Sequence, residues 1–180
     1  ADLLASAAVN KSRIIHVDAE RGFSGGEVQV FHLMRGLREL GFDQRLIAPP
    51  GSRASEEARS QGFDVTEVPM RNSMDLRAVL GLRRAFRELT AGQPSVVHLH
   101  TGRATWLGGL ASAGLGVPVI STRRMDRRVK RSLGTRLLYG KLLTKVVAIS
   151  GPVRDCLLAG GVPEHMIETI YSSVDVDAVR

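Results

Sequence analysis

Cysteine is nearly absent from this sequence of 180 residues, in which Cys156 stands alone. No disulfide can form within the chain, so we expect it in a reducing compartment, the cytoplasm. Long hydrophobic runs are also lacking, because no window reaches the ~18 uninterrupted apolar residues that a membrane-spanning helix needs. Residues 1–11 have too short an apolar stretch, and no basic flank, for a signal peptide. We expect these residues to be disordered or foreign to the natural chain, and we expect no integral membrane segment.

Negative charge is scarce in one segment, residues 121–145. This segment has nine lysines and arginines against one acidic residue, Asp126, and so carries +8, whereas the whole chain carries +7. The rest of the chain is close to neutral, and we expect an anionic partner at one place on the surface. Tyr139 is the only aromatic residue of the segment. Little is available to stack on bases, so nucleic acid is not the expected partner.

Leucines stand among the cations of this segment, a pattern typical of helices that lie on anionic lipid. We expect a basic, amphipathic helix that holds the protein peripherally on the inner face of the cytoplasmic membrane. The alternative is a solvated helix whose leucines simply pack on a sheet. The expected membrane contacts are Arg127, Arg128, Lys130 and Arg131.

Short β-branched runs alternate with longer segments of helical periodicity along the chain. Parallel strands need crossover connections, so this alternation predicts a doubly wound, mostly parallel α/β sheet in three layers, with helices on both faces. The expected strands are residues 12–19, 43–49, 64–70, 95–100, 118–122, 145–150 and 167–173. The expected helices are residues 27–41, 55–62, 75–92, 103–116, 135–143 and 152–161.

Two adjacent glycines, Gly25 and Gly26, follow the first expected strand and precede the first expected helix. In doubly wound sheets, ligands bind beyond the carboxyl ends of the strands. Glycines there let the backbone pass close to a ligand, and the free N–H groups of the following helix favour an anion. We therefore expect a phosphate or a sugar to approach this turn. The alternative is a plain tight turn with glycine at positive φ.

The strand ends lack the residues that two common doubly wound classes require. The glycine spacing is not G-x-G-x-x-G, and the second strand ends in IAPP with no acidic residue for a ribose, which argues against a nicotinamide cofactor. A phospho-receiver domain needs an aspartate at the end of the third strand and a lysine after the fifth, where VPMRN and STRR stand. We expect no cofactor.

Two histidines, His98 and His100, close the fourth expected strand, where alternation puts both imidazoles on one side. Two ligands without a third Cys, Asp or Glu nearby are too few for a usual metal site, so no metal is expected. His100, nearer the strand end, is either a hydrogen-bonding residue of a polar cleft or a structural histidine. For His98 we expect the structural role.

Three segments together resemble the N-terminal domain of glycosyltransferase family 4, whose retaining enzymes have the GT-B fold of two Rossmann-like domains facing a cleft. GFSGGEVQVFHLMRGLRELGFD resembles the family's glycine loop and first helix. SVVHLHTGRATWLGGLASAGLGVPVIST resembles its central strand, helix and strand. VVAISGPVRDCLLAGGVPEHMIETIYSSVD resembles the end of the domain.

The resemblance implies that residues 12–175 form an acceptor-binding domain and that residues 176–180 begin a linker to a second domain. That second domain would hold most of the nucleotide-sugar donor and supply a pair of glutamates, so this chain alone should be inactive and its catalytic residues should lie elsewhere. The glycines would lie near the donor's diphosphate and the acceptor. The expected substrate contacts are Gly25, Gly26, His100, Arg103 and Arg124.

One position departs from the family pattern. Family members commonly place a histidine two residues after the residue that matches Thr122, where it touches the transferred sugar, and here Arg124 occupies that place. Arginine cannot accept a proton, although it binds a phosphate or carboxylate bidentately. Either the sugar contact is made differently, or the substrate is anionic.

The function implied is transfer of a sugar from a nucleotide-sugar donor to a lipid-linked or lipopolysaccharide-type acceptor at a membrane face. A domain of a sugar-nucleotide epimerase is one alternative; such an enzyme would release a soluble sugar and need no membrane patch. A free-standing binding module is the other. A module would bind its ligand tightly as this chain alone, whereas half of a cleft should bind a donor weakly.

Overall fold

A single seven-stranded sheet organises the chain in the computed structural model, which describes residues 12–22 and 24–172. The strand order is β3-β2-β1-β4-β5-β6-β7, and every neighbouring pair is parallel. The predicted doubly wound, Rossmann-like fold is thus confirmed, with an entirely parallel sheet. The strands are β1 (Arg13–Val17), β2 (Gln44–Ala48), β3 (Asp64–Glu67), β4 (Ser95–Leu99), β5 (Val119–Arg123), β6 (Lys145–Ala148) and β7 (Ile167–Thr169).

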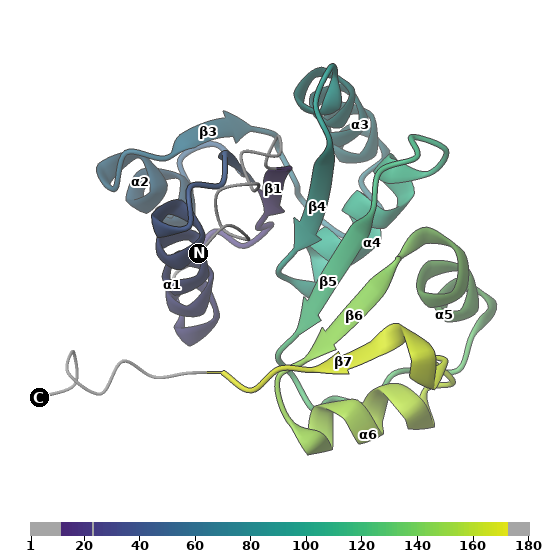
Figure 1. The fold of residues 1–180 in the computed structure, drawn as a ribbon. Coiled ribbons are helices and arrows are strands. Elements are labelled where there is room, and N and C mark those ends of the chain that lie inside the picture. Colours follow the sequence, from purple (N-terminus) through teal and green to yellow (C-terminus); the bar gives the residue numbers. More distant parts are fainter. Residues whose placement is uncertain (1–11, 23, 173–180) are drawn as a thin grey trace, which may run out of the picture.

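Helices lie on both faces of this sheet (Figure 1). In that view α1 and α2 lie on one side, α3, α4 and α5 on the other, and α6 runs beside β6 and β7. The α-helices are α1 (Gly25–Glu39), α2 (Arg53–Ser60), α3 (Leu76–Thr90), α4 (Gly102–Ser112), α5 (Leu133–Leu137) and α6 (Gly151–Ala159). A π-helical turn, η2 (Leu138–Leu142), continues α5, and a 3₁₀ turn, η3 (Glu164–Met166), precedes β7.

Two apolar clusters hold the layers together. The smaller lies between the sheet and the α1–α2 side, where Phe31 and Met34 pack with Leu46. The larger joins the sheet to α3, α4, η2 and α6, and Phe86, Leu107 and other large side chains in it are fully buried. Burial of this kind is the dominant stabilising contribution to a domain of this size.

The ends of the helices match the sequence signals with two corrections. Gly41, Gly62 and Gly92, which directly follow helices or their caps, all adopt positive φ, as expected of helix stops. Helix α1 begins at Gly25 rather than at residue 27, because Ser24 caps it. Helix α2 begins at Arg53 rather than at residue 55, because Ser52 caps it with a hydroxyl that accepts from the amide of Ser55 at 3.2 Å.

The helix expected at residues 135–143 is present as α5 and η2, but the most basic part of the segment, which precedes it, is not helical. Residues 124–132 form neither helix nor strand, and regular α-helix begins only at Leu133. This connection is held to α6 instead: Val129 packs against the main core, and Nε of Arg131 donates to the carbonyl of Ala159 at 3.0 Å. A helix cap then forms from Ser132, because its hydroxyl accepts from the amide of Thr135.

Three predictions from the sequence concern residues that the structure does not describe. The expected disorder of residues 1–11, the expected domain end at residue 175 and the expected linker at residues 176–180 all lie outside the described residues. Within the part of the chain that the structure describes, every helix is too short or too polar to cross a bilayer.

Candidate functional site

The start of α1 is closed by a capping box. The backbone amide and the hydroxyl of Ser24 both donate to Oε2 of Glu27, at 2.5 and 2.6 Å, while the amide of Gly26 donates to the Ser24 hydroxyl at 3.3 Å. Glu27 is 4% exposed. The carboxylate already satisfies donors at this helix end and brings negative charge there, so the site is less favourable for a phosphate than the sequence suggested.

The two glycines differ in their surroundings. Neither is among the glycines with positive φ, so the alternative of a tight left-handed turn is wrong. A Cβ on Gly25 would meet nothing within 4 Å. A Cβ on Gly26 would lie 3.7 Å from Cδ of Arg124, and Gly26 lines a cavity that Gly25 does not.

This cavity, which we call the rim cavity, lies at the carboxyl ends of β1, β4 and β5, as predicted for this fold. Its volume is about 290 Å³. Its walls come from the start of α1, the start of α4, the chain after β5, and η2. The lining residues with polar side chains near or on α1 and α4 are Glu20, Ser24, Glu27, His100, Thr101 and Thr105. An apolar wall is made by Trp106, Met125 and Tyr139.

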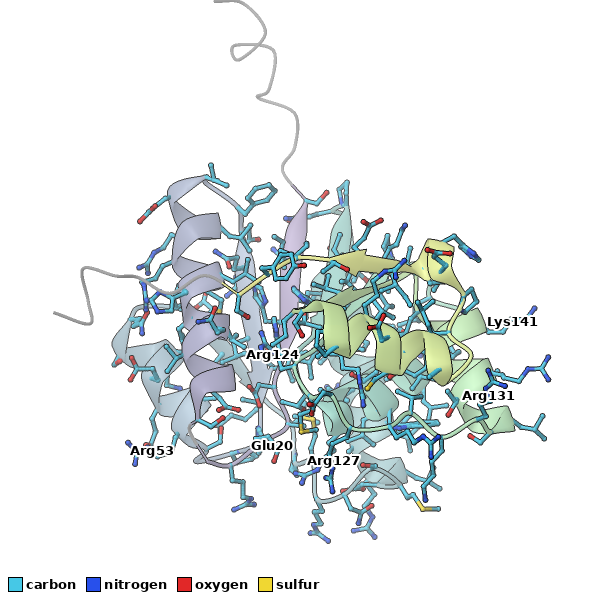
Figure 2. All side chains as sticks on the ribbon, turned by 90° about the horizontal axis from the view of Figure 1, so that it is seen from below. Glu20, Arg53, Arg124, Arg127, Arg131 and Lys141 are labelled. Atoms are coloured by element: carbon cyan, nitrogen blue, oxygen red, sulfur yellow. The ribbon has the colours of Figure 1, made fainter. Side chains whose placement is uncertain are left out.

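Arg124 is half-buried in the wall of the rim cavity, and it lies near the middle of the view in Figure 2. Its Nη1 donates to the backbone carbonyl of His100 at 2.8 Å, and its Nε is buried without a hydrogen-bond partner in the described structure. Burial lowers the pKa of Arg124, and the nearby carboxylates of Asp18 and Glu27 act in the opposite direction. A buried guanidinium with an unused donor is equipped to bind an acidic or hydroxyl oxygen.

Asp18 follows β1 and is 1% exposed. Its pKa is raised to about 6, mainly by burial and also by the carboxylates of Glu27 and Glu20, against the opposing effects of the Glu20 amide and Arg124. Asp18 does not line the rim cavity, but it adds a third carboxyl group near Arg124 to those of Glu20 and Glu27, which do line it.

Arg103 was predicted to contact substrate, but its side chain is engaged elsewhere. Its Nη1 donates to the carbonyls of Ala19 at 2.8 Å and Met70 at 3.4 Å, and its Nη2 lies 3.7 Å from a carboxylate oxygen of Glu20. It is not among the residues that line the rim cavity. These contacts brace the connection after β1, and substrate contact by Arg103 stays a prediction without support from this geometry.

A third histidine joins the predicted pair. His16 of β1 stands opposite His98 of β4 in the parallel register, and Nδ1 of His16 lies 2.9 Å from Nε2 of His100. One ring nitrogen from each of the three histidines lies within 4.8 Å of the others. The shared side of His98 and His100 is confirmed by ring centroids 4.1 Å apart. Sequence reasoning missed His16, because only the pairing of β1 with β4 brings it here.

The three imidazoles are neutral at physiological pH. Burial lowers the pKa of His16 to about 4 and that of His98 to about 3, and it lowers the pKa of His100 well below its usual range. His98 is bound through Nε2 to the hydroxyl of Thr122 at 2.7 Å, which agrees with its predicted structural role. His100, in contrast, lines the rim cavity.

The basic residues predicted to touch a membrane lie on the connection after β5. Arg127, Arg128 and Lys130 are exposed, and Arg131 is exposed but bonded to α6. Exposed apolar side chains stand beside them, with Met125 52%, Leu133 84% and Leu137 48% exposed. Arg131 and Lys141 project at the periphery of the molecule in Figure 2.

Comparisons with known proteins agree with this architecture. The model of Glycosyltransferase Family 4 matches residues 23–178. Curated protein sequences give no significant match. Among solved structures, a glycosyltransferase from Rickettsia africae is similar, with a TM-score of 0.75 and 22% sequence identity. The matched region covers 93% of this chain and 45% of the Rickettsia chain.

Two other solved structures illustrate the range of the fold. Anabaena Alr3699/HepE, in complex with UDP and glucose, has a TM-score of 0.73 and 14% identity, with 92% of this chain and 46% of that one covered. A UDP-N-acetylglucosamine 2-epimerase has a TM-score of 0.59 and 15% identity, with 88% and 48% covered. The chain thus spans a little under half the length of each of these structures.

Proposed function

The chain belongs to glycosyltransferase family 4, and on that premise we propose that it is the acceptor-binding domain of a retaining glycosyltransferase. The enzyme would transfer a sugar from a nucleotide-sugar donor to a lipid-linked or lipopolysaccharide-type acceptor. The donor would be held mainly by a second domain facing the rim cavity. The observation that carries this proposal is the rim cavity itself, at the sheet edge where doubly wound folds bind their ligands.

The chemistry of the cavity suits a sugar. Carbohydrates offer many hydroxyl donors and acceptors together with apolar C–H faces. The cavity supplies acceptors from Glu20 and Glu27, a cation from Arg124, and an apolar wall that includes Trp106. The absence of a side chain at Gly26 leaves the α1 side of this space open.

Turnover tests the proposal directly. Release of nucleotide from UDP-, GDP- and ADP-sugars is measured with a bacterial lipid extract as acceptor, for this chain and for a longer protein in which a second α/β domain follows it. We expect no turnover by the chain alone, because most donor contacts would be absent, and transfer to lipid by the longer protein. Turnover by the 180-residue chain would contradict the proposal.

A sugar-nucleotide epimerase is the second candidate, since an epimerase shares the fold. The product separates the two functions, because an epimerase releases a soluble sugar and labels no lipid. Tight binding of a nucleotide sugar to the chain alone would instead support a free-standing binding module.

We extend the proposal to membrane attachment through the exposed cations after β5. Three of them, Arg127, Arg128 and Lys130, lie in the chain between two exposed apolar residues, Met125 and Leu133. Each basic residue near an anionic bilayer contributes about 1 kcal/mol. Replacing all three by glutamine should therefore weaken binding to vesicles with phosphatidylserine by about 100-fold.

A matched variant separates local attachment from a general charge effect. Three exposed arginines near or on α3 can be replaced by glutamine with the same loss of charge: Arg71, Arg77 and Arg87. Their replacement should leave vesicle affinity within about twofold of the unmodified chain. Equal weakening by both triple variants, or binding that does not fall with added salt, would contradict attachment through the chain after β5.

A further inference from the structure

We propose that His100 presents an unprotonated Nδ1 to the rim cavity as the hydrogen-bond acceptor for a hydroxyl group of the ligand. We further propose that a buried chain of hydrogen bonds through His16 and Gln44 fixes this polarity. Only the identity of the hydroxyl as that of a sugar rests on the proposed function.

The chain of hydrogen bonds begins at a group that can only accept. The carbonyl of Met34 accepts from Nε2 of Gln44 at 3.0 Å, which fixes the orientation of the Gln44 amide. The other end of that amide, Oε1, can only accept, and it lies 3.1 Å from Nε2 of His16. The proton of His16 therefore resides on Nε2, and its Nδ1 is left with a free lone pair.

The same argument applies to the imidazole of His100. Nδ1 of His16 lies 2.9 Å from Nε2 of His100, and because that Nδ1 must accept, Nε2 of His100 must donate. A neutral imidazole carries one proton. Nδ1 of His100 is therefore unprotonated.

Neutrality of the rings is required for this inference, and burial supplies it. A charged His16 would donate from both nitrogens and would reverse the polarity of His100. Burial holds the pKa values of His16 and His100 far enough below neutrality to exclude that state at pH 7. The nearby guanidinium of Arg124 also lowers the pKa of His100, because it repels a second positive charge.

The free lone pair of His100 is buried and unused. His100 is 3% exposed, and its Nδ1 has no hydrogen-bond partner in the described structure. Buried polar atoms are nearly always paired, and exceptions mark functional groups or bound molecules that the structure does not contain. Since His100 lines the rim cavity, a ligand in that cavity is the partner to consider.

The surroundings select the kind of ligand group. A phosphate is disfavoured, because its oxygen lone pairs would repel the lone pair of Nδ1 and its negative charge would repel the carboxylate of Glu27, which lines the same cavity. A cation would face Arg124, whose Nη1 is bonded to the carbonyl of His100. A neutral hydroxyl donates without either conflict.

A metal ion fits the three histidines less well than this hydrogen-bonded arrangement. Ligating nitrogens must be unprotonated and aimed at one point. Here Nδ1 of His16 is already occupied by the N–H of His100. A metal there would have to expel that proton and break the contact.

The first test measures the tautomers in the 180-residue chain labelled with ¹⁵N-histidine, by two-bond ¹H–¹⁵N correlation spectra at pH 7.5. We expect His16 and His100 both protonated at Nε2, with Nδ1 of His100 at the shift of an unprotonated nitrogen. Protonation of His100 at Nδ1 would overturn the proposal. This measurement needs no variant and no nucleotide.

Two variants of Gln44 test its positioning role. Gln44→Glu keeps an acceptor facing Nε2 of His16, and in spectra recorded at pH 9, where His16 stays neutral beside the added carboxylate, it should preserve the tautomer of His100. Gln44→Met removes that acceptor and should give a mixture of the two His100 tautomers. An unchanged His100 tautomer in a folded Gln44→Met chain would show that the polarity is set elsewhere and would overturn the part assigned to Gln44.

The second test uses simple probes in the same spectra. Methyl α-D-glucopyranoside should move the Nδ1 resonance of His100 saturably in the direction of an accepted hydrogen bond, while inorganic phosphate at equal concentration should not. No shift with the glycoside, an equal shift with phosphate, or a stoichiometric shift with Zn²⁺ would each overturn the assignment to a hydroxyl. Failure of sugar transfer in the turnover assay would leave the tautomer result standing, so the two failures can be told apart.

Discussion

Substitution of the two glycines at the start of α1 separates their structural from their functional contribution. Both residues lie in the first helical turn at φ values open to any residue. Glycine within a helix costs about 0.5–1 kcal/mol relative to alanine. Gly25→Ala and Gly26→Ala should therefore leave the free energy of unfolding unchanged or raise it by up to about 1 kcal/mol, as measured by urea denaturation.

Valine at these positions should distinguish them in function. A Cβ on Gly26 lies 3.7 Å from Cδ of Arg124, and a further methyl group reaches about 1.5 Å beyond it. A methyl group pointing that way would displace Arg124 and narrow the rim cavity. Gly25 is the matched control, because nothing lies within 4 Å of its Cβ position and it does not line the cavity.

The assay is sugar transfer by the two-domain enzyme that the proposed function implies. Gly26→Val should lower turnover at least tenfold, and Gly25→Val should leave it within about twofold. Both variants should unfold within about 1 kcal/mol of the unmodified protein, as changes outside the core usually do. Full activity of Gly26→Val, or equal loss in both variants, would refute the assignment of Gly26 to the ligand site.

Two further predictions concern stability. Acidification from pH 7 to pH 5 should lower the free energy of unfolding, because the unfolded chain takes up protons below pH 6.5 that His16 and His98, with folded pKa values of about 4 and about 3, do not bind. Each histidine lowers the free energy of unfolding by roughly 2 kcal/mol over this range. Asp18, whose folded pKa is raised to about 6, takes up a proton in the folded chain and offsets about 1 kcal/mol of that loss. Equal urea midpoints at the two pH values would contradict this prediction. Gly160→Ala should destabilise the chain by about 1–3 kcal/mol, because the new Cβ would lie 2.5 Å from Cβ of Val129. Val129→Gly, but not Val129→Ala, should relieve that clash, and rescue by both would show that the contact is not the cause.

Local sequence patterns predicted the fold because each element carries its own signals. All seven strands lie within or next to their expected ranges, and the helix stops at Gly41, Gly62 and Gly92 are correct. The errors lie where a tertiary contact outweighs local pattern. The basic residues 124–132 were expected to belong to a helix with the leucines that follow them, yet they form neither helix nor strand, because Val129 packs against the main core and Arg131 bonds to α6.

The site was predictable only in part. Gly26, His100 and Arg124 do line one cavity, because each follows a strand or begins a helix at the same edge of the sheet. His16 gave no local signal, since its role depends on the register of β1 with β4. Tyr139 likewise reaches the cavity from a segment 15 residues beyond Arg124 in the chain, through the π-helical turn.

The most direct test of the central claim is a crystal structure of the two-domain enzyme with the nucleotide sugar that it turns over and a stable acceptor analogue. The account predicts a sugar in the rim cavity, against the backbone of Gly26, with a hydroxyl donating to Nδ1 of His100 and an oxygen accepting from Arg124. A ligand bound elsewhere, with the rim cavity empty or filled by the protein's own side chains, would contradict it.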